Sequence, residues 1–172
     1  GGNRGWPYSY HEANDAANTS RLQSFATSHI PSPWMGDRGV FQFFPSPHAL
    51  PAADRVERSL AFAHDDETDR PDRYAVRLDG GAAAGGVDVE ITTGAWSVWM
   101  RTRFPDDTAS IIFDQIDADG ALDLSDAETS SVITGFVDGP GGLVDVPRTY
   151  VYAEIDVPVT GARRQEHPER AQ

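Results

Sequence analysis

One segment of the 172-residue chain gathers residue types that suit the binding of a sugar. It reads His29-Ile30-Pro31-Ser32-Pro33-Trp34-Met35-Gly36-Asp37. Proline restricts the backbone on both sides of Ser32, so we expect a stiff loop that presents Trp34 with His29 and Asp37 nearby. An indole can stack on the C–H face of a pyranose, and Asp or His can bind its hydroxyls. The same residues also fit a structural loop with a core tryptophan and an aspartate that caps a turn.

The first 50 residues differ from the rest of the chain because aromatic residues and prolines crowd together with little periodicity. The aromatic residues are Trp6, Tyr8, Tyr10, Phe25, Trp34, Phe41, Phe43 and Phe44. Long irregular segments in compact domains are often functional, although such rings can also plug the open end of a sandwich. We assign residues 1–50 to a pocket-forming segment, 51–160 to the strands of the sandwich, and 161–172 to a polar tail or linker.

Two acidic stretches could hold a cation. Asp117, Asp119 and Asp123 surround Gly120, which resembles part of a calcium loop. However, Gln115 then occupies the first ligand position, and the flanking residues have the pattern of strands and not of helices. A solvated acidic turn is therefore favoured, with an adhesive calcium-binding domain as the alternative. The second stretch, residues 64–72, is interpreted as a solvated connection between strands.

Composition narrows the classes of function. The formal net charge is −13 at pH 7, and all 14 basic residues are arginine. This balance argues against binding to nucleic acid or to an anionic membrane, because both need a basic surface. The absence of cysteine excludes disulfides, zinc-thiolate sites and cysteine nucleophiles. No apolar run approaches a membrane span, and no nucleophile elbow, phosphate loop or dinucleotide fingerprint occurs.

Hydrophobic residues mostly alternate with period two, which is typical of β-strands. We expect strands at 74–78, 87–91, 96–104, 111–113, 132–136 and 151–159, and near 40–44 and 57–63. Gly94 marks a bulge or tight turn, Pro45-Ser46-Pro47 a turn, and residues 12–26 a weak helical turn. The pattern predicts an all-β fold, an antiparallel β-sandwich or a barrel.

The order of several short segments resembles the N-terminal domain of glycoside hydrolase family 92, the calcium-dependent exo-acting α-mannosidases. The similar segments include Gly5-Trp6-Pro7-Tyr8-Ser9-Tyr10, Gln23-Ser24-Phe25, His29 with Pro31 to Asp37, and Phe62-Ala63-His64-Asp65-Asp66-Glu67. They continue with Pro71 to Asp79, Val87 to Thr92, Phe104-Pro105, Ile111 to Asp114, Ile133-Thr134-Gly135 and Tyr150 to Asp156. The resemblance runs from about residue 5 to residue 159.

The resemblance implies a supersandwich-like β-sandwich that packs on a larger helical domain, with the active site between them. Members hydrolyse terminal α-mannosides with inversion, and a calcium ion contacts the sugar. The resemblance also implies that the catalytic carboxylates and most calcium ligands belong to the helical domain. We therefore expect this chain to be an incomplete part of a longer protein. No catalytic residue or metal ligand is assigned in it, and alone it should be inactive.

By position, the resemblance carries substrate-binding roles to Trp34, His29 and Asp37, and also to Trp6 and Tyr10. The chain would form one wall of the pocket for a terminal α-mannoside, with the helical domain as its partner. The family also implies a secreted or periplasmic protein, although the chain shows no signal peptide. A stand-alone carbohydrate-binding β-sandwich module is the alternative function.

Overall fold

The computed structural model describes residues 21–26, 41–115, 120–138 and 148–165, and these form two compact units. The first unit contains residues 21–26 and Phe43–Phe113. The second contains Phe41, Gln42 and the described residues from Asp114 onward. Twelve strands and three short helical segments occur in these residues, so the predicted all-β, antiparallel, sandwich-like fold is confirmed.

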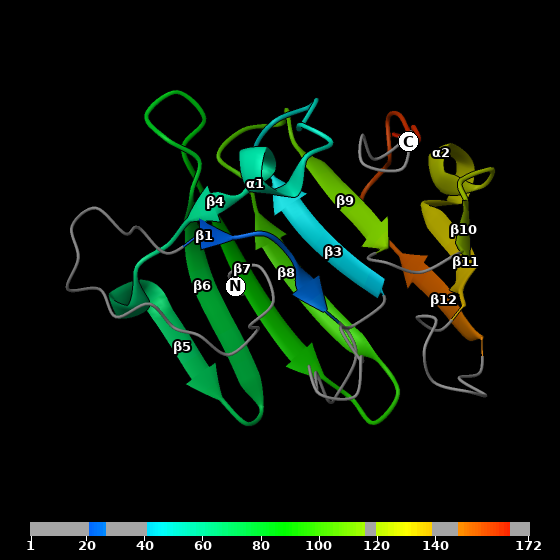
Figure 1. Ribbon diagram of the computed structural model, residues 1–172, viewed down its shortest axis with the longest axis horizontal. Helices are drawn as coiled ribbons and strands as arrows, with labels where there is room; N and C mark the ends of the chain where they lie inside the picture. Colours follow the sequence, from blue (N-terminus) through cyan, green and yellow to red (C-terminus); the bar gives the residue numbers. More distant parts are fainter. Residues whose placement is uncertain (1–20, 27–40, 116–119, 139–147, 166–172) are drawn as a thin grey trace. The chain divides into compact units, whose positions relative to one another are not determined.

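The largest sheet has six strands, in the order β1-β4-β6-β7-β8 with β5 paired to the outer part of β6 (Figure 1). Its strands are β1 (Arg21–Leu22), β4 (Leu60–Ala61), β5 (Glu67–Arg70), β6 (Arg73–Asp79), β7 (Gly86–Thr93) and β8 (Val98–Arg103). The register places Val76 opposite Val89, and Ile91 opposite Met100. Alternate residues of each strand therefore share one face of the sheet.

A second sheet has the strand order β2-β3-β9, and β2 and β3 lie in front of the large sheet in Figure 1. Its strands are β2 (Phe25–Ala26), β3 (Phe41–Ser46) and β9 (Ser110–Gln115). Phe25, Phe43 and Phe44 join Val76, Leu78, Val87 and Val89 of the large sheet in one buried cluster. Burial of these side chains between the two sheets is the main force that holds the first unit together.

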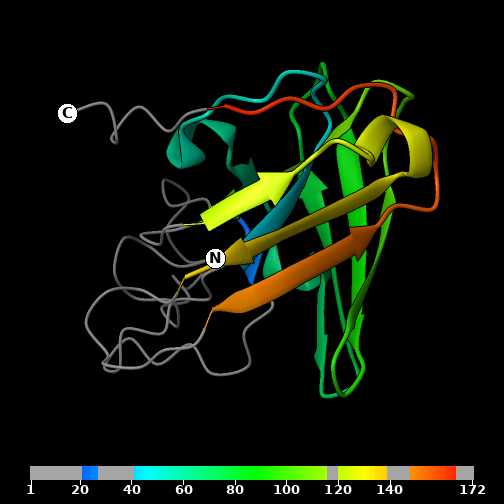
Figure 2. The ribbon, with the colours of Figure 1, turned by 90° about the vertical axis from the view of Figure 1, so that its right-hand side faces the viewer.

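The third sheet belongs to the second unit and has three antiparallel strands, drawn in yellow and orange in Figure 2. They are β10 (Gly120–Asp123), β11 (Val132–Val137) and β12 (Thr149–Glu154). The helix α2 (Ala127–Ser130) connects β10 to β11. It ends at Ser131, whose φ of 57° is left-handed and redirects the chain into β11.

Most predicted strands are confirmed, including those at 74–78, 87–91, 111–113 and 132–136. The expected strand at 96–104 begins only at Val98, because Gly94 starts a tight turn in which its N–H donates to the Ser97 carbonyl at 2.8 Å. The prediction that the strand at 151–159 continues to Val159 is wrong. Strand β12 ends at Glu154, where its partner β11 begins, and the Ile155 N–H instead donates to the Ser131 carbonyl at 2.9 Å.

Four further predictions are wrong in the described residues. Pro45 lies inside β3 and not in a turn, because a strand tolerates a missing N–H near its end. Residues 57–63 contain the end of α1 (Arg55–Arg58) and only a two-residue strand. Residues 64–72 form η1 (His64–Asp66) and the edge strand β5. Residues 21–26, expected to be part of a helical turn, are the strands β1 and β2.

Candidate functional site

The predicted pocket residues Trp34, His29, Asp37, Trp6 and Tyr10 all lie outside the described residues. The structure does show what holds the two ends of the segment that carries the first three. That segment leaves β2 and enters β3, and these strands are neighbours in one sheet. The ring centroids of Phe25 in β2 and Phe43 in β3 lie 5.8 Å apart, and those of Phe25 and Phe44 lie 6.5 Å apart. Both ends are therefore fixed in the hydrophobic core.

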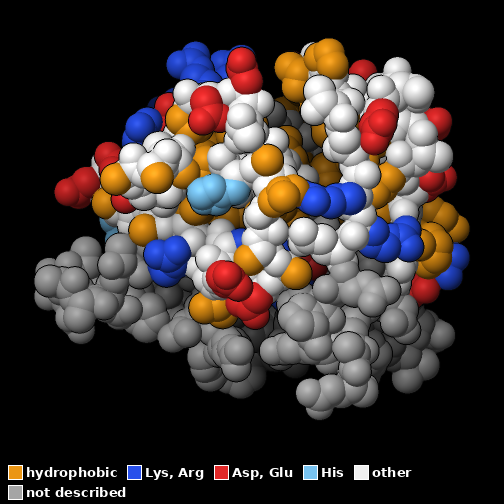
Figure 3. Space-filling model, turned by 90° about the horizontal axis from the view of Figure 1, so that it is seen from above, with side chains coloured by type: hydrophobic (Ala, Val, Ile, Leu, Met, Phe, Trp, Pro, Cys, Tyr) orange, Lys and Arg blue, Asp and Glu red, His pale blue; other side chains and the backbone are white. Residues whose placement is uncertain are grey.

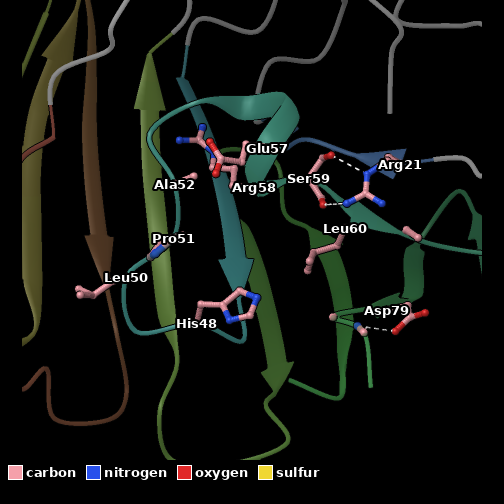
Figure 4. A pocket seen from close by; sticks show the side chains of 13 residues that line it. Arg21, His48, Leu50, Pro51, Ala52, Glu57, Arg58, Ser59, Leu60 and Asp79 are labelled. Atoms are coloured by element: carbon pink, nitrogen blue, oxygen red, sulfur yellow. Dashed lines mark hydrogen bonds between the residues drawn. The ribbon is translucent and has the colours of Figure 1, made fainter. Parts of the chain in front are cut away.

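A polar hollow of about 400 Å³ lies in the first unit, and Figure 4 shows its lining from close by. Its described lining residues, which define the name polar hollow, are Arg21, His48, Leu50, Pro51, Ala52, Glu57, Arg58, Ser59, Leu60, Ala61, Asp79, Gly80 and Gly81. Figure 3 shows the protein from above the view of Figure 1, with acidic and basic side chains interspersed among hydrophobic ones. Mixed charge suits a polar ligand better than an anion or a cation.

Helix α1 places two charged side chains at the polar hollow. Asp54 caps this helix, since its Oδ1 accepts hydrogen bonds from the N–H groups of Val56 at 2.8 Å and Glu57 at 2.9 Å. Arg58 then turns inward, is buried, and donates through Nη1 to the Ala53 carbonyl at 3.1 Å. The capped helix therefore fixes the positions of Glu57 and Arg58.

Arg21 and the turn after β6 complete the polar part of the lining. Arg21 donates through Nε to the Ser59 hydroxyl at 2.8 Å and through Nη2 to the Ser59 carbonyl. Asp79 Oδ1 accepts from the Gly81 N–H at 2.7 Å. Gly81 adopts a φ of +84°, which favours glycine. No Trp, Tyr or Phe occurs among the described lining residues, so the part described lacks a ring on which a pyranose could stack.

A second polar group, missed by sequence reasoning, lies at the edge of the large sheet. Glu67 begins β5, and only 9% of its side chain is exposed. Its Oε2 lies 2.7 Å from His64 Nδ1, and its Oε1 accepts from the Tyr74 hydroxyl at 2.6 Å. The Phe62 ring meets the His64 ring edge-on, with centroids 5.4 Å apart. This carboxylate is engaged by two partners, which indicates a role in holding β5 and β6 together.

The sequence comparison decides the family. Residues 2–170 match the family described as the glycosyl hydrolase family 92 N-terminal domain. The chain belongs to this family. The assignment confirms the resemblance inferred from the order of short segments, and it includes the aromatic segment that precedes β3. A comparison of this family 92 domain with curated proteins found no match.

A solved structure shows the same fold in a larger protein. It is the structure of a family GH92 inverting mannosidase from Bacteroides thetaiotaomicron VPI-5482, with a TM-score of 0.71 and 23% sequence identity. The match covers 91% of the present chain and 19% of the mannosidase chain. The family 92 domain therefore spans about a fifth of the length of that enzyme.

The family resemblance implies calcium, an ion that needs several oxygen ligands close together. Nowhere in the described ranges do three His, Asp or Glu side chains come close enough to bind a metal ion. Asp117 and Asp119 of the calcium-like loop lie outside these ranges. Asp123 Oδ1 instead accepts from the Ser125 N–H at 2.9 Å, and this bond lowers the pKa of Asp123. The described residues of this family 92 domain thus do not fit a calcium centre.

The second unit presents aromatic side chains and one bidentate ion pair. The Arg148 guanidinium lies 3.8 Å from the centre of the Phe136 ring. It also donates to both carboxylate oxygens of Asp138, at 2.7 and 3.0 Å. The hydrogen bond from Arg148 lowers the pKa of Asp138, and the same bond raises the pKa of Arg148. Tyr150 and Tyr152, on the neighbouring strand β12, are mostly exposed.

Alternation in the sequence could not single out Glu67, because residues 67–70 are all polar and the burial of Glu67 depends on pairing with β6. Glu67 pairs with Val76 of β6, so both residues point to the buried face. Asp65, Asp66, Asp69 and Asp72 are exposed, so this stretch is solvated as expected although part of it is a strand, whereas Glu67 is largely buried. Among the helices in the described part of this family 92 domain, none is long and apolar enough to cross a membrane.

Proposed function

We propose that this chain is the N-terminal β-sandwich of an α-mannosidase-like glycoside hydrolase and forms one wall of its pocket for a terminal α-mannoside. The observation that carries the proposal is the family match over residues 2–170. The shared fold with an inverting mannosidase supports it. Because the chain spans 19% of that enzyme's length, the rest of the hydrolase would come from a helical domain that is its partner.

In the proposed pocket, Trp34 stacks on the mannoside or on its leaving sugar. Asp37 and His29 bind hydroxyls or hold the loop in place, with Trp6 and Tyr10 as further wall residues. Support comes from the way in which the core holds the ends of the segment between β2 and β3. Phe43 and Phe44 are buried, so the start of β3 forms a firm base for a loop that must keep its shape.

The chemistry is proposed to lie in the helical domain. Inversion needs one carboxylic acid to protonate the leaving oxygen and a second carboxylate to activate water. Three carboxylates of the first unit already have partners: Glu67 with His64 and Tyr74, Asp88 with Arg77, and Glu90 with Arg73. The proposed calcium ion likewise takes its ligands mostly from the helical domain. The full-length enzyme is proposed to be secreted or periplasmic.

An assay with an aryl α-mannoside tests where the chemistry lies. The 172-residue chain alone should release no aryl alcohol above the background rate, with and without added calcium. Turnover that exceeds the background would show that the chain itself contains the catalytic carboxylates. Binding is tested separately, with methyl α-mannoside and the variant Trp34→Ala. Identical binding by the wild type and the variant would reject the stacking role.

A stand-alone carbohydrate-binding module is the second candidate function. The observation that favours it is the exposure of Trp96 and Trp99, two large rings that the domain does not use in its own core. A reading frame that continues into a helical segment with candidate carboxylates would favour the hydrolase. A chain that binds mannan without such a partner would favour the module.

A further inference from the structure

Two tryptophans that the fold leaves in solvent lie near the end of the β7–β8 hairpin, Trp96 in the turn and Trp99 in β8. Trp96 is 99% exposed and Trp99 is 72% exposed. Single exposed apolar residues are common, but two exposed indoles within four residues of the chain call for an explanation. The Gly94 N–H donates to the Ser97 carbonyl at 2.8 Å, and a side chain at Gly94 would lie 2.7 Å from the Ser97 hydroxyl. The turn is therefore closed by its own backbone hydrogen bond, which fixes the backbone on both sides of Trp96.

On the outer face of the large sheet, Trp99 lies among polar side chains. Trp99 lies opposite Thr92, whose hydroxyl donates to the Asp72 carbonyl at 2.8 Å. One row further along, Arg101 lies opposite Glu90. Glu90 binds Arg73 at 2.6 Å through one carboxylate oxygen and lies 3.8 Å from Arg101 through the other. We call Trp96, Trp99, Thr92, Glu90, Arg73 and Arg101 the tryptophan face.

Charge on this side of the sheet differs from charge in the chain as a whole. Alternation along β5, β6 and β8 puts five of the 14 arginines there, namely Arg70, Arg73, Arg77, Arg101 and Arg103. Carboxylates pair with most of them, as in the 2.7 Å contact between Arg77 and Asp88. The outer face of the large sheet thus offers hydrogen-bond donors beside acceptors and has little excess charge. The whole chain, by contrast, carries a net charge of −13.

This combination indicates one kind of occupant. Paired guanidinium and carboxylate groups suit the neighbouring hydroxyls of an uncharged pyranose, and indole rings suit its C–H face. A second copy of the chain would bring another charge of −13, and an anionic polymer would find few guanidinium groups that carboxylates have not already paired. Neither limit applies to an uncharged glycan.

We propose that the tryptophan face is a second glycan-binding site, which holds internal residues of an α-mannan chain. Its residues are separate from those assigned to the terminal-mannoside pocket. The inference rests on the proposed function for the choice of α-mannan as the glycan. In a hydrolase that removes terminal residues, such a site would keep the polymer bound between successive cleavages.

Affinity electrophoresis of the 172-residue chain in gels with soluble α-mannan tests this site. We expect the wild type to be retarded, and Trp96→Ala and Trp99→Ala each to weaken binding about tenfold, which corresponds to about 1.4 kcal/mol. Because both rings are exposed, the variants should keep the wild-type unfolding temperature. Tyr152→Ala is the matched control, since Tyr152 is 68% exposed but lies in the other unit, and it should bind like the wild type.

Several outcomes would overturn the inference. They are no retardation of the wild type, an equal loss in Tyr152→Ala, or salt-sensitive binding of dextran sulfate in place of mannan. A wild-type dimer that Trp99→Ala converts to monomer would show that the face binds a second copy. Loss of mannan binding in Trp34→Ala alone would assign all binding to the predicted pocket. If methyl α-mannoside fails to bind but mannan binding requires Trp99, the proposed pocket fails and this inference stands.

Discussion

The two compact units of the chain differ in how they bury their hydrophobic side chains. In the first unit, residues from two sheets meet in one cluster, and Phe44, Leu78, Val87 and Val89 are almost completely buried. In the second unit, one three-stranded sheet has Ile133 and Val137 buried, while Tyr150 and Tyr152 remain exposed on β12. We infer that the first unit is stabilised mainly by its core, whereas the described part of the second unit buries fewer hydrophobic side chains.

The largest expected effect comes from breaking the core of the first unit. Phe44→Ala should lower the free energy of unfolding by about 3–5 kcal/mol, because it removes a 1% exposed ring and leaves a cavity between the two sheets. Urea denaturation followed by tryptophan fluorescence and circular dichroism measures the change. Tyr150→Ala, on the exposed face of β12, is the control. If the two variants lose equal stability, the contrast between the units is wrong.

A smaller effect is expected from the polar group at the edge of the large sheet. Tyr74→Phe removes the hydroxyl that donates to Glu67 and leaves that largely buried carboxylate with one hydrogen bond fewer. The free energy of unfolding should fall by about 1–3 kcal/mol. Tyr152→Phe removes an exposed hydroxyl and should change it by less than about 0.5 kcal/mol. Thermal unfolding of both variants would detect the difference, and equal changes would contradict a structural role for Glu67.

The smallest effect concerns the surface ion pair of the second unit. Arg148 lowers the pKa of Asp138 in the folded chain, so the contribution of this pair to stability is present above the ordinary value near 3.8. It is lost as the pH falls below that value, through the lowered folded pKa. Arg148→Ala should raise the pKa of Asp138 toward its ordinary value. Titration of the Asp138 carboxyl carbon by NMR measures this directly, and an unchanged midpoint would show that the pair does not form in solution.

Much of the fold could be predicted from the sequence where one face of a strand is buried. Alternation in β6 and β7 gave correct positions because Tyr74, Val76 and Leu78 face the core while Arg73 and Arg77 face solvent. It failed for β5, whose charged residues form a strand only because β6 offers a pairing edge. It also failed beyond Glu154, because strand length depends on the partner β11 and not on the local pattern.

The candidate sites also differ in how far the sequence could predict them. Trp34 and its neighbours were singled out by residue type and family resemblance, and these assignments lie outside the described residues and stay predictions. The tryptophan face could not be predicted, because Trp96 is in phase with the inward-facing Val98 and Met100, so the pattern predicts that it continues the strand. The tight turn at Gly94 leaves Trp96 outside the strand, and the phase of β8 turns Trp99 away from the core.

The central claim is that this family 92 domain supplies one wall of a pocket for a terminal α-mannoside while the reaction occurs elsewhere. NMR titration of the 172-residue chain with methyl α-mannoside tests this most directly, with Trp34→Ala beside the wild type. We expect saturable shifts in the wild-type spectrum that include the Trp34 indole N–H, and a clear loss of affinity in the variant. Wild-type spectra that do not change with the sugar, or equal affinities of the two proteins, would contradict it.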